Sequence, residues 1–127
     1  MLRNPVNARP ASAVVTVWIH DWRPRATEVG TNARCHWTKK AKAAREARML
    51  TTAALCSAGV DRGLSPCIVH LTMFMERGKP PDDDNLAAML KNVRDAVAAY
   101  FGVPDDWHGP RWSYGWERGP DGVRIEA

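Results

Sequence analysis

The sequence predicts an α+β fold, in which helices pack on a small mixed sheet and the elements follow the order β-α-β-α-β-β. Two observations support this prediction. Segments rich in strong helix formers alternate with segments rich in β-branched and aromatic residues. The chain of 127 residues also has the length of one domain, so residues 1–127 are expected to form a single domain with one core.

The first half of the chain predicts two strands with a helix between them. Residues 13–19, AVVTVWI, have the β-branched and aromatic content of a strand, and residues 1–12 before them are expected to form a flexible arm. Residues 20–34 show no periodicity and predict a long loop. Residues 67–75, CIVHLTMFM, form a continuous apolar run, which is typical of a strand buried on both faces.

The helix between these strands is predicted for residues 38–58, TKKAKAAREARMLTTAALCSA. Its residues are mainly Ala, Lys, Arg and Leu, all of which favour helices. We expect Thr38 to cap the start of this helix and Gly59 to end it.

A second helix is predicted from about residue 85 to residue 101, where apolar residues recur at helical spacing on one face. Gly102 is expected to end it, because glycine readily adopts the left-handed conformation that closes helices. The remaining elements are a loop at 103–109, a strand at 111–117, a turn at 119–122 and a strand at 123–127. The tight turn predicts that the last two strands pair as a hairpin.

Charge is distributed unevenly along the chain, whose net charge is +4. Most of the acidic residues lie from Glu76 onward, whereas the first predicted helix is basic and contains one acidic residue, Glu46. A basic helix is expected to attract the phosphates of nucleic acid. The basic residues assigned to DNA binding are Arg34, Lys39, Lys40, Lys42, Arg45, Arg77 and Lys79.

Composition also suggests where the protein acts. The sequence contains no run of about 18 apolar residues that would span a membrane and no apolar segment typical of a secretory signal. Its three cysteines are an odd number without a CxxC pair, which favours a reduced, cytoplasmic protein over a disulfide scaffold. A zinc site that includes Cys35 and His36 is a less favoured alternative, because adjacent residues are an unusual spacing for zinc ligands.

The acidic triplet of Asp82, Asp83 and Asp84 stands at the start of the second predicted helix. Acidic side chains there can cap free N–H groups and oppose the helix dipole. Three adjacent carboxylates exceed what capping requires, and a divalent cation such as Mg²⁺ would relieve their repulsion. Asp105 and Asp106 form a second acidic pair after the helix, and they can join the same ion if the loop folds back. The residues alone leave a metal site and a capping role both open.

Four residues of the second helix, Asp84, Ala88, Lys91 and Asp95, fall on one stripe at 100° per residue. Lys91 and Asp95 can form an ordinary surface ion pair. Alternatively, the ammonium group of Lys91 can contact a phosphate or orient an attacking water molecule. Together with the basic first helix, this acidic and lysine-containing segment favours a nuclease.

The motifs DDDNL at 82–86, LKNVRDAV at 90–97 and GVPDD at 102–106 resemble those of the RusA-type Holliday-junction resolvases, which are common in prophages. The family pattern is Asp-x-Asp-Asn-Leu at the start of a helix, a lysine in that helix and an Asp-Asp pair in the following loop. The lysine stands three positions further along here than in the best-known member. The middle residue of the triplet is acidic here and apolar in that member.

The resemblance implies a homodimer that cuts four-way DNA junctions by paired phosphodiester hydrolysis with Mg²⁺, for which Mn²⁺ can substitute. It implies that Asp82, Asp84 and Asp106 are catalytic metal ligands, with Asp105 as a further ligand, and that Lys91 is the catalytic lysine. A two-fold symmetric dimer suits a two-fold symmetric junction. The alternatives are a non-catalytic DNA-binding protein that keeps the fold and a nuclease for other branched DNA.

Other residues near these motifs have competing interpretations. Trp107 and Trp112 can stack on unpaired bases, although packing in the core or in a dimer interface is favoured. His108, beside the acidic pair, is a candidate general base. His70 lies in an apolar strand and is expected to be a hydrogen-bonded residue of the core or of an interface.

Overall fold

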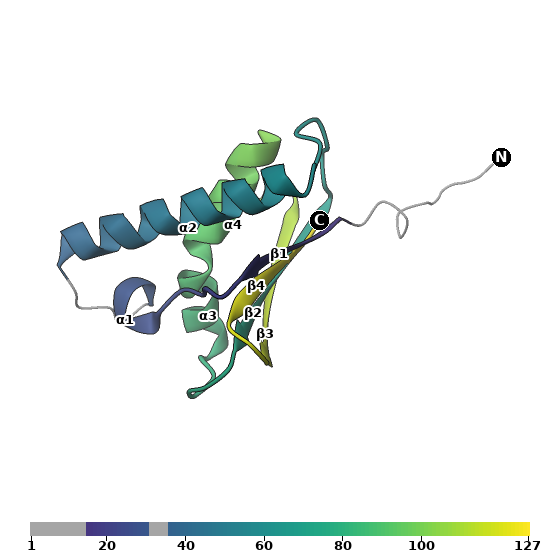
Figure 1. The fold of residues 1–127 in the computed structure, drawn as a ribbon. Coiled ribbons are helices and arrows are strands. Elements are labelled where there is room, and N and C mark those ends of the chain that lie inside the picture. The colour runs from purple at the N-terminus through teal and green to yellow at the C-terminus, as the bar shows by residue number, and fades with distance from the viewer. Residues whose placement is uncertain (1–14, 31–35) are drawn as a thin grey trace.

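The computed structural model describes residues 15–30 and 36–127, and it confirms the α+β fold with a small mixed sheet (Figure 1). Its strands are β1 (Thr16–His20), β2 (Ile68–Met75), β3 (Arg111–Arg118) and β4 (Gly122–Glu126). Its helices are α1 (Ala26–Val29), α2 (Trp37–Ser57), α3 (Asp83–Met89) and α4 (Lys91–Phe101). The expected N-terminal arm at residues 1–12 lies outside the described residues.

Strand β4 occupies a central place in the sheet, whose order is β1-β4-β2-β3. It pairs antiparallel with β1 on one side and with β2 on the other, while β3 pairs parallel with β2. The predicted hairpin of the last two strands is therefore wrong. Val123 and Ile125 give the physical reason. Both are almost completely buried between apolar residues of β1 and β2, which a place at the edge of the sheet would not provide.

The core lies between one face of the sheet and the helices that cover it (Figure 1). Alternate residues of each strand point into this layer, among them Leu71 and Met73 of β2. Helix α4 covers the layer with Val93, Val97 and Tyr100, which confirms the apolar helix face expected from the sequence. Each fully buried side chain of this kind stabilises the fold by about 1.5–3 kcal/mol relative to exposure.

Helix α2 begins one residue before the predicted helix, and His36 caps it in place of Thr38. The Nδ1 atom of His36 accepts a hydrogen bond from the backbone N–H of Thr38 at 3.2 Å. The expected end is confirmed, because the helix ends at Ser57 and Gly59 follows with a φ of +70°.

The first half of α2 extends beyond the sheet (Figure 1). The fully buried residues of this helix, Ala47, Thr51 and Leu55, all lie from its midpoint onward. The alanines and lysines of the first half therefore form a helical arm that rests on little of the core.

The second predicted helix is interrupted at Leu90, which separates α3 from α4. Leu90 has a φ of −91° and a ψ of 1°, outside the α-helical range, and its side chain is completely buried. The interruption contains neither proline nor glycine, so the sequence does not predict it. Gly102 ends α4 with a left-handed φ of +66°, as expected.

A single turn of helix, α1, forms within the segment predicted to be a loop. It packs between α2 and α3. At Gly30, just after this turn, a Cβ atom would lie 2.8 Å from Oδ1 of Asn85 in α3. The glycine therefore allows α1 to approach α3 closely, and this approach shapes the groove described below.

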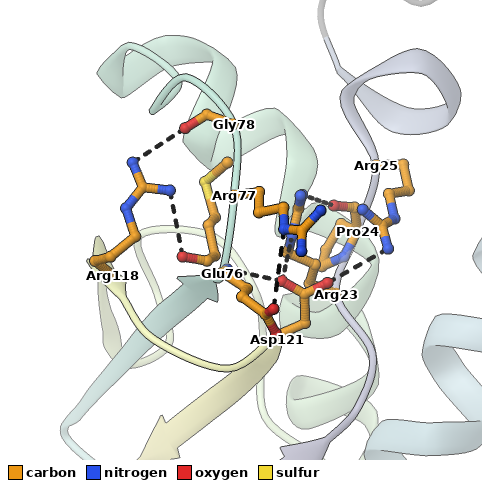
Figure 2. Close-up of polar contacts among 9 residues, drawn as sticks. Arg23, Pro24, Arg25, Glu76, Arg77, Gly78, Arg118 and Asp121 are labelled. Atoms are coloured by element: carbon orange, nitrogen blue, oxygen red, sulfur yellow. Dashed lines mark hydrogen bonds and ion pairs between the residues drawn. The ribbon is translucent and has the colours of Figure 1, made fainter.

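Asp121, in the turn between β3 and β4, joins three segments that are distant in the sequence (Figure 2). Its Oδ1 atom accepts hydrogen bonds from the backbone N–H of Glu76 at 2.9 Å and from Nε of Arg23 at 3.1 Å. Its Oδ2 atom accepts one from Arg25 at 3.4 Å. The hydrogen bond from Glu76 is the main cause that lowers the pKa of Asp121 below its ordinary value, while partial burial opposes it and Arg23 adds to it. Asp121 thereby holds the end of β2 and the segment before α1 against the turn.

We expect Asp121→Asn to lower the free energy of unfolding by about 2 kcal/mol at pH 7, because hydrogen bonds to charged groups contribute about 1.5–3 kcal/mol. Since the folded-state pKa is lowered, this contribution is present above the unfolded pKa of about 3.9 and is lost as the pH falls through the folded pKa. Urea unfolding of both proteins from pH 7 to pH 2 measures the difference, which should shrink only at the acidic end.

Glu76→Gln is the control for this experiment. The carboxylate of Glu76 lies 4.0 Å from Arg77, and both side chains are exposed, so its loss should change stability little. Equal effects of the two substitutions would contradict the role given to Asp121.

Candidate nucleic-acid interface and acidic site

The three carboxylates of the acidic triplet are exposed, and one of them accepts a hydrogen bond from the backbone of the helix that follows it. Asp82 caps α3, because its Oδ1 atom accepts the backbone N–H of Asn85 at 2.8 Å. Asp83 and Asp84 stand in the first turn of α3, and neither takes part in a hydrogen bond or ion pair within the parts of the chain that the structure describes. Capping thus explains one of the three acidic residues.

Asp105 and Asp106 follow α4, and their side chains interact with different residues. The Oδ1 atom of Asp106 accepts the backbone N–H of His108 at 2.9 Å and lies 3.2 Å from its Nδ1 atom. The hydrogen bond from that N–H is the main cause that lowers the pKa of Asp106 below its ordinary value. Asp105 instead interacts with the side chain of Asp95 in α4.

Asp95 stands at the centre of a small group of charges on α4. Its Oδ2 atom accepts a hydrogen bond from Nζ of Lys91 at 2.8 Å. Its Oδ1 atom is buried without a hydrogen-bond donor and lies 3.7 Å from Nε of Arg94. Burial alone would raise the pKa of Asp95, but the interactions with Lys91, Asp105 and Arg94 outweigh it and lower that pKa. Arg94 also donates to the hydroxyl of Tyr114 in β3, at 3.2 Å.

The carboxylates that the sequence assigned to one metal ion do not all converge. Within residues 15–30 and 36–127, no three His, Cys, Asp or Glu side chains form a group that could hold a metal ion. Asp84 stands at the start of α3 and Asp105 follows α4, so two helices separate them. Asp84 and Asp95 also lie on different helices, on either side of the interruption at Leu90. The acidic residues that do lie together are Asp95 and Asp105.

Asp95 is the acidic residue that the sequence did not assign to the site. Its position one helical turn after Lys91 is visible in the sequence, but the same spacing is typical of surface ion pairs. Mg²⁺ is commonly held by one or two carboxylates, with water and phosphate oxygens in the other positions. The Asp95–Asp105 pair therefore has the carboxylate chemistry of a magnesium ligand set. The Oδ1 atom of Asp95 lacks a hydrogen-bond donor but is buried, so the side chain would have to turn before this oxygen could contact an ion.

An open groove of about 350 Å³ brings two of the predicted residues together. Lys40, from the first half of α2, and Lys91, from the start of α4, both line it. The rest of the lining is small or short, with Ala41, Ala44 and Ala88 on the helices and α1 at one end. The groove thus joins a lysine predicted to bind DNA with the lysine predicted to be catalytic.

A second depression, of about 240 Å³, adjoins this groove. The two share Glu28, Val29 and Asn92 in their linings. Arg23 and Arg25 line the second depression together with the carboxylates of Glu28 and Glu46.

The remaining residues assigned to DNA binding are distributed over two surfaces. Lys39, Lys42 and Arg45 are exposed on α2. Arg77 and Lys79 are exposed in the connection between β2 and α3, close to the Asp121 contacts (Figure 2 shows Arg77). Arg34 lies outside the described residues, as does Cys35 of the alternative zinc site.

The aromatic residues near the acidic pair differ in their surroundings. Trp112 packs against the core, as favoured from the sequence. Trp107 is 85% exposed, so it does not pack in the core of the chain, and its packing in a dimer interface stays a prediction. The ring of Trp107 lies over that of His108, with centroids 3.7 Å apart. The expected hydrogen bond of His70 is confirmed, because its Nδ1 atom lies 2.6 Å from Oγ of Ser113.

Comparison with known proteins gives one relevant match. No model of a known protein family matches the chain. A protein of Xylella fastidiosa (strain Temecula1 / ATCC 700964), named as an uncharacterized protein, is 36% identical over 83 residues. The match covers 61% of this chain and 54% of that protein, so the chain spans about half the length of its relative.

In the parts of the chain that the structure describes, none of the helices combines the length and the apolar character needed to cross a membrane.

Gly109 closes the loop that carries Asp105 and Asp106. Its N–H donates to the carbonyl of Asp106 at 3.0 Å, and a Cβ atom at this position would lie 1.9 Å from the carbonyl oxygen of Pro104. We expect Gly109→Ala to lower the free energy of unfolding by about 1–3 kcal/mol, because backbone atoms would have to move apart. Thermal unfolding followed by circular dichroism measures this loss.

Gly63→Ala is the matched control. A Cβ atom there would meet the flexible side chain of Asp61 at 3.2 Å, which can rotate away. The close contact at Gly109 would be refuted if the two alanine variants unfolded at the same temperature as the unchanged protein.

Proposed function

We propose that this protein is a Mg²⁺-dependent endodeoxyribonuclease that hydrolyses phosphodiester bonds in branched DNA, with the four-way junction as its first candidate substrate. The observation that carries the proposal is the groove bordered by Lys40 and Lys91. Asp95 lies one turn after Lys91 on α4, and Asp105, in the loop after α4, interacts with Asp95. Paired cations next to paired carboxylates suit a phosphodiester and a divalent ion together.

Asp95 and Asp105 are the residues that would hold Mg²⁺ in this arrangement. Bound there, the ion would neutralise charge on a phosphate and lower the pKa of a coordinated water molecule. The resemblance to the junction resolvases adds Asp82, Asp84 and Asp106 as catalytic carboxylates. Their assignment rests on the motif alone, because they are not grouped with the Asp95–Asp105 pair in the described structure.

The basic side chains have separate tasks in this proposal. Lys40 and Lys91 bind a phosphate in the groove, and Lys91 exchanges its 2.8 Å hydrogen bond with Asp95 for this phosphate when Asp95 holds the ion. Lys39, Lys42 and Arg45 extend the positive surface along α2, and Arg77 and Lys79 extend it at the other end of α3. Such contacts make affinity depend strongly on salt concentration.

The proposal includes a homodimer and a cytoplasmic location. A junction has two equivalent strands to cut, and two copies of the chain related by a two-fold axis would supply two equivalent sites. A DNA substrate and the three cysteines, two of which are free and exposed in the described structure, agree with a reduced compartment.

A non-catalytic DNA-binding protein is the second candidate. The observation that favours it is the separation of the acidic triplet from the Asp95–Asp105 pair. Titration calorimetry with Mg²⁺ and Mn²⁺ distinguishes the two candidates, because the second predicts DNA binding without any heat of metal binding.

We expect purified protein to nick a four-way junction in the presence of Mg²⁺ or Mn²⁺ and to lose this activity in EDTA. Asp105→Asn and Asp84→Asn should each reduce nicking by about 100-fold or more while junction binding persists, since each removes a proposed charge-stabilising group. End-labelled strands resolved on denaturing gels measure nicking, and fluorescence anisotropy in EDTA measures binding.

The two substitutions separate the structural argument from the motif argument. Loss of nicking in Asp105→Asn alone would assign the metal to the Asp95–Asp105 pair, and loss in both would extend the site to α3. Asp61→Asn, an exposed carboxylate in a distant loop, is the control for charge. The nuclease proposal fails if the unchanged protein binds junctions but cuts no branched substrate with either metal.

A further inference from the structure

We propose that the groove between α2 and the α3–α4 junction binds one unpaired nucleotide, with its phosphate between Lys40 and Lys91 and its base stacked on Trp37. The inference rests on the proposed function, because it assumes that the substrate is DNA. It goes further by naming the part of the substrate that occupies this groove, and by adding Trp37 as a residue that contacts it.

The lining of the groove fits a sugar-phosphate backbone. Ammonium groups border it from two different helices, Lys40 from α2 and Lys91 from α4, and one carboxylate, that of Glu28, lies in the lining. Among the lining residues, two ammonium groups face one carboxylate, which favours an anionic backbone. Asp95, which pairs with Lys91 at 2.8 Å, lies outside the lining. Alanines at 41, 44 and 88 leave the space between the helices open, so a strand can approach the helix surfaces closely.

Trp37 extends the groove-facing stripe of α2. Positions 37, 41 and 44 are spaced as i, i+4 and i+7, and Lys40 is the i+3 neighbour of Trp37. Three of these four residues, Lys40, Ala41 and Ala44, line the groove. Trp37 is therefore the next side chain along the same face, one turn before Lys40, and it is 71% exposed.

A single exposed tryptophan is common on protein surfaces and has no meaning alone. Here the indole lies beside a lysine that borders a cationic groove, and such a combination of aromatic rings with a positive track is typical of single-strand binding. The face of a base is accessible to an indole only when the base is unpaired and unstacked, because a duplex presents base edges and backbone. The chemistry of the site therefore selects an unpaired nucleotide, such as one at a branch point, over continuous duplex.

Lys42 provides a control for charge on the same helix. It stands two residues after Lys40, about 200° around the helix axis, and it does not line the groove. Met49, exposed on the second half of α2, provides a control for the loss of apolar surface. Both comparisons use the full chain, and circular dichroism establishes that each variant keeps its helix content.

The experiment measures anisotropy of labelled oligonucleotides in EDTA, so that binding is separated from cleavage. The probes are a single-stranded oligonucleotide, a junction with 2-aminopurine at the branch point and a linear duplex of the same sequence. We expect Trp37→Ala to weaken binding of the single strand about tenfold and to abolish quenching of 2-aminopurine, and Trp37→Phe to keep much of both. Met49→Ala should leave both unchanged.

For the lysines, Lys40→Ala should weaken single-strand binding several-fold more than duplex binding. Lys42→Ala should weaken both by a similar factor, because it removes only a long-range charge. Equal selectivity of the two lysine variants, or unaltered quenching in Trp37→Ala, would overturn the inference while the nuclease proposal stands. If the unchanged protein binds none of the probes, both proposals fail. If it binds single strands in the proposed manner but never cuts, the groove assignment stands and the nuclease proposal falls.

Discussion

The insertion of β4 between β1 and β2 is the constraint on which the rest of the structure depends. With β4 on one side of β2, β3 can pair only on the other side, and the parallel pair that results needs a crossover connection. That crossover is α3 and α4, which begin after β2 and end before β3. The acidic groups at the two ends of the crossover are separated for this reason. The groove forms beside its middle, where Leu90 interrupts the helix and α1 and α2 pack against it.

The ion pair between Lys91 and Asp95 leaves the ammonium group of Lys91 able to bind another anion. Its hydrogen bond with Asp95 joins two side chains that are substantially exposed, and ion pairs of this kind contribute little to stability. In the proposed function, a phosphate in the groove would displace Asp95 from Lys91 at little cost to the stability of the fold. In the proposed nuclease, a cation held by Asp95 and Asp105 would remove the competing carboxylate and strengthen the hold of Lys91 on the substrate. Metal and DNA would then bind cooperatively through one lysine.

Local patterns in the sequence were sufficient for the strands, for the apolar face of α4 and for the glycines that end helices, because these depend on neighbours in the chain. The pairing of β4 and the break at Leu90 were not predictable in this way. Both are decided by burial in a core assembled from distant segments, and Leu90 breaks its helix without proline or glycine. At the site, the motif pointed to Lys91, to Asp82, Asp84 and Asp106, and to Asp105 as a further ligand. That Lys40 lies across a groove from Lys91, and Asp105 beside Asp95, becomes apparent only when α2 packs beside α4 and the loop folds back.

The first half of α2, which extends beyond the sheet, has a consequence for how a DNA strand would reach the groove in the proposed function. The turns that carry Trp37 and Lys40 have no fully buried side chain, so their helical state depends mainly on the intrinsic preference of alanine and lysine. Such a segment can unwind or swing as a unit at a small fraction of the cost of global unfolding. The wall of the groove on α2 is therefore held by less core packing than the opposite wall, where Leu90 is completely buried. In the proposed function, a displacement of this wall would let a strand that has duplex on both sides enter the groove from the side, without being threaded from an end.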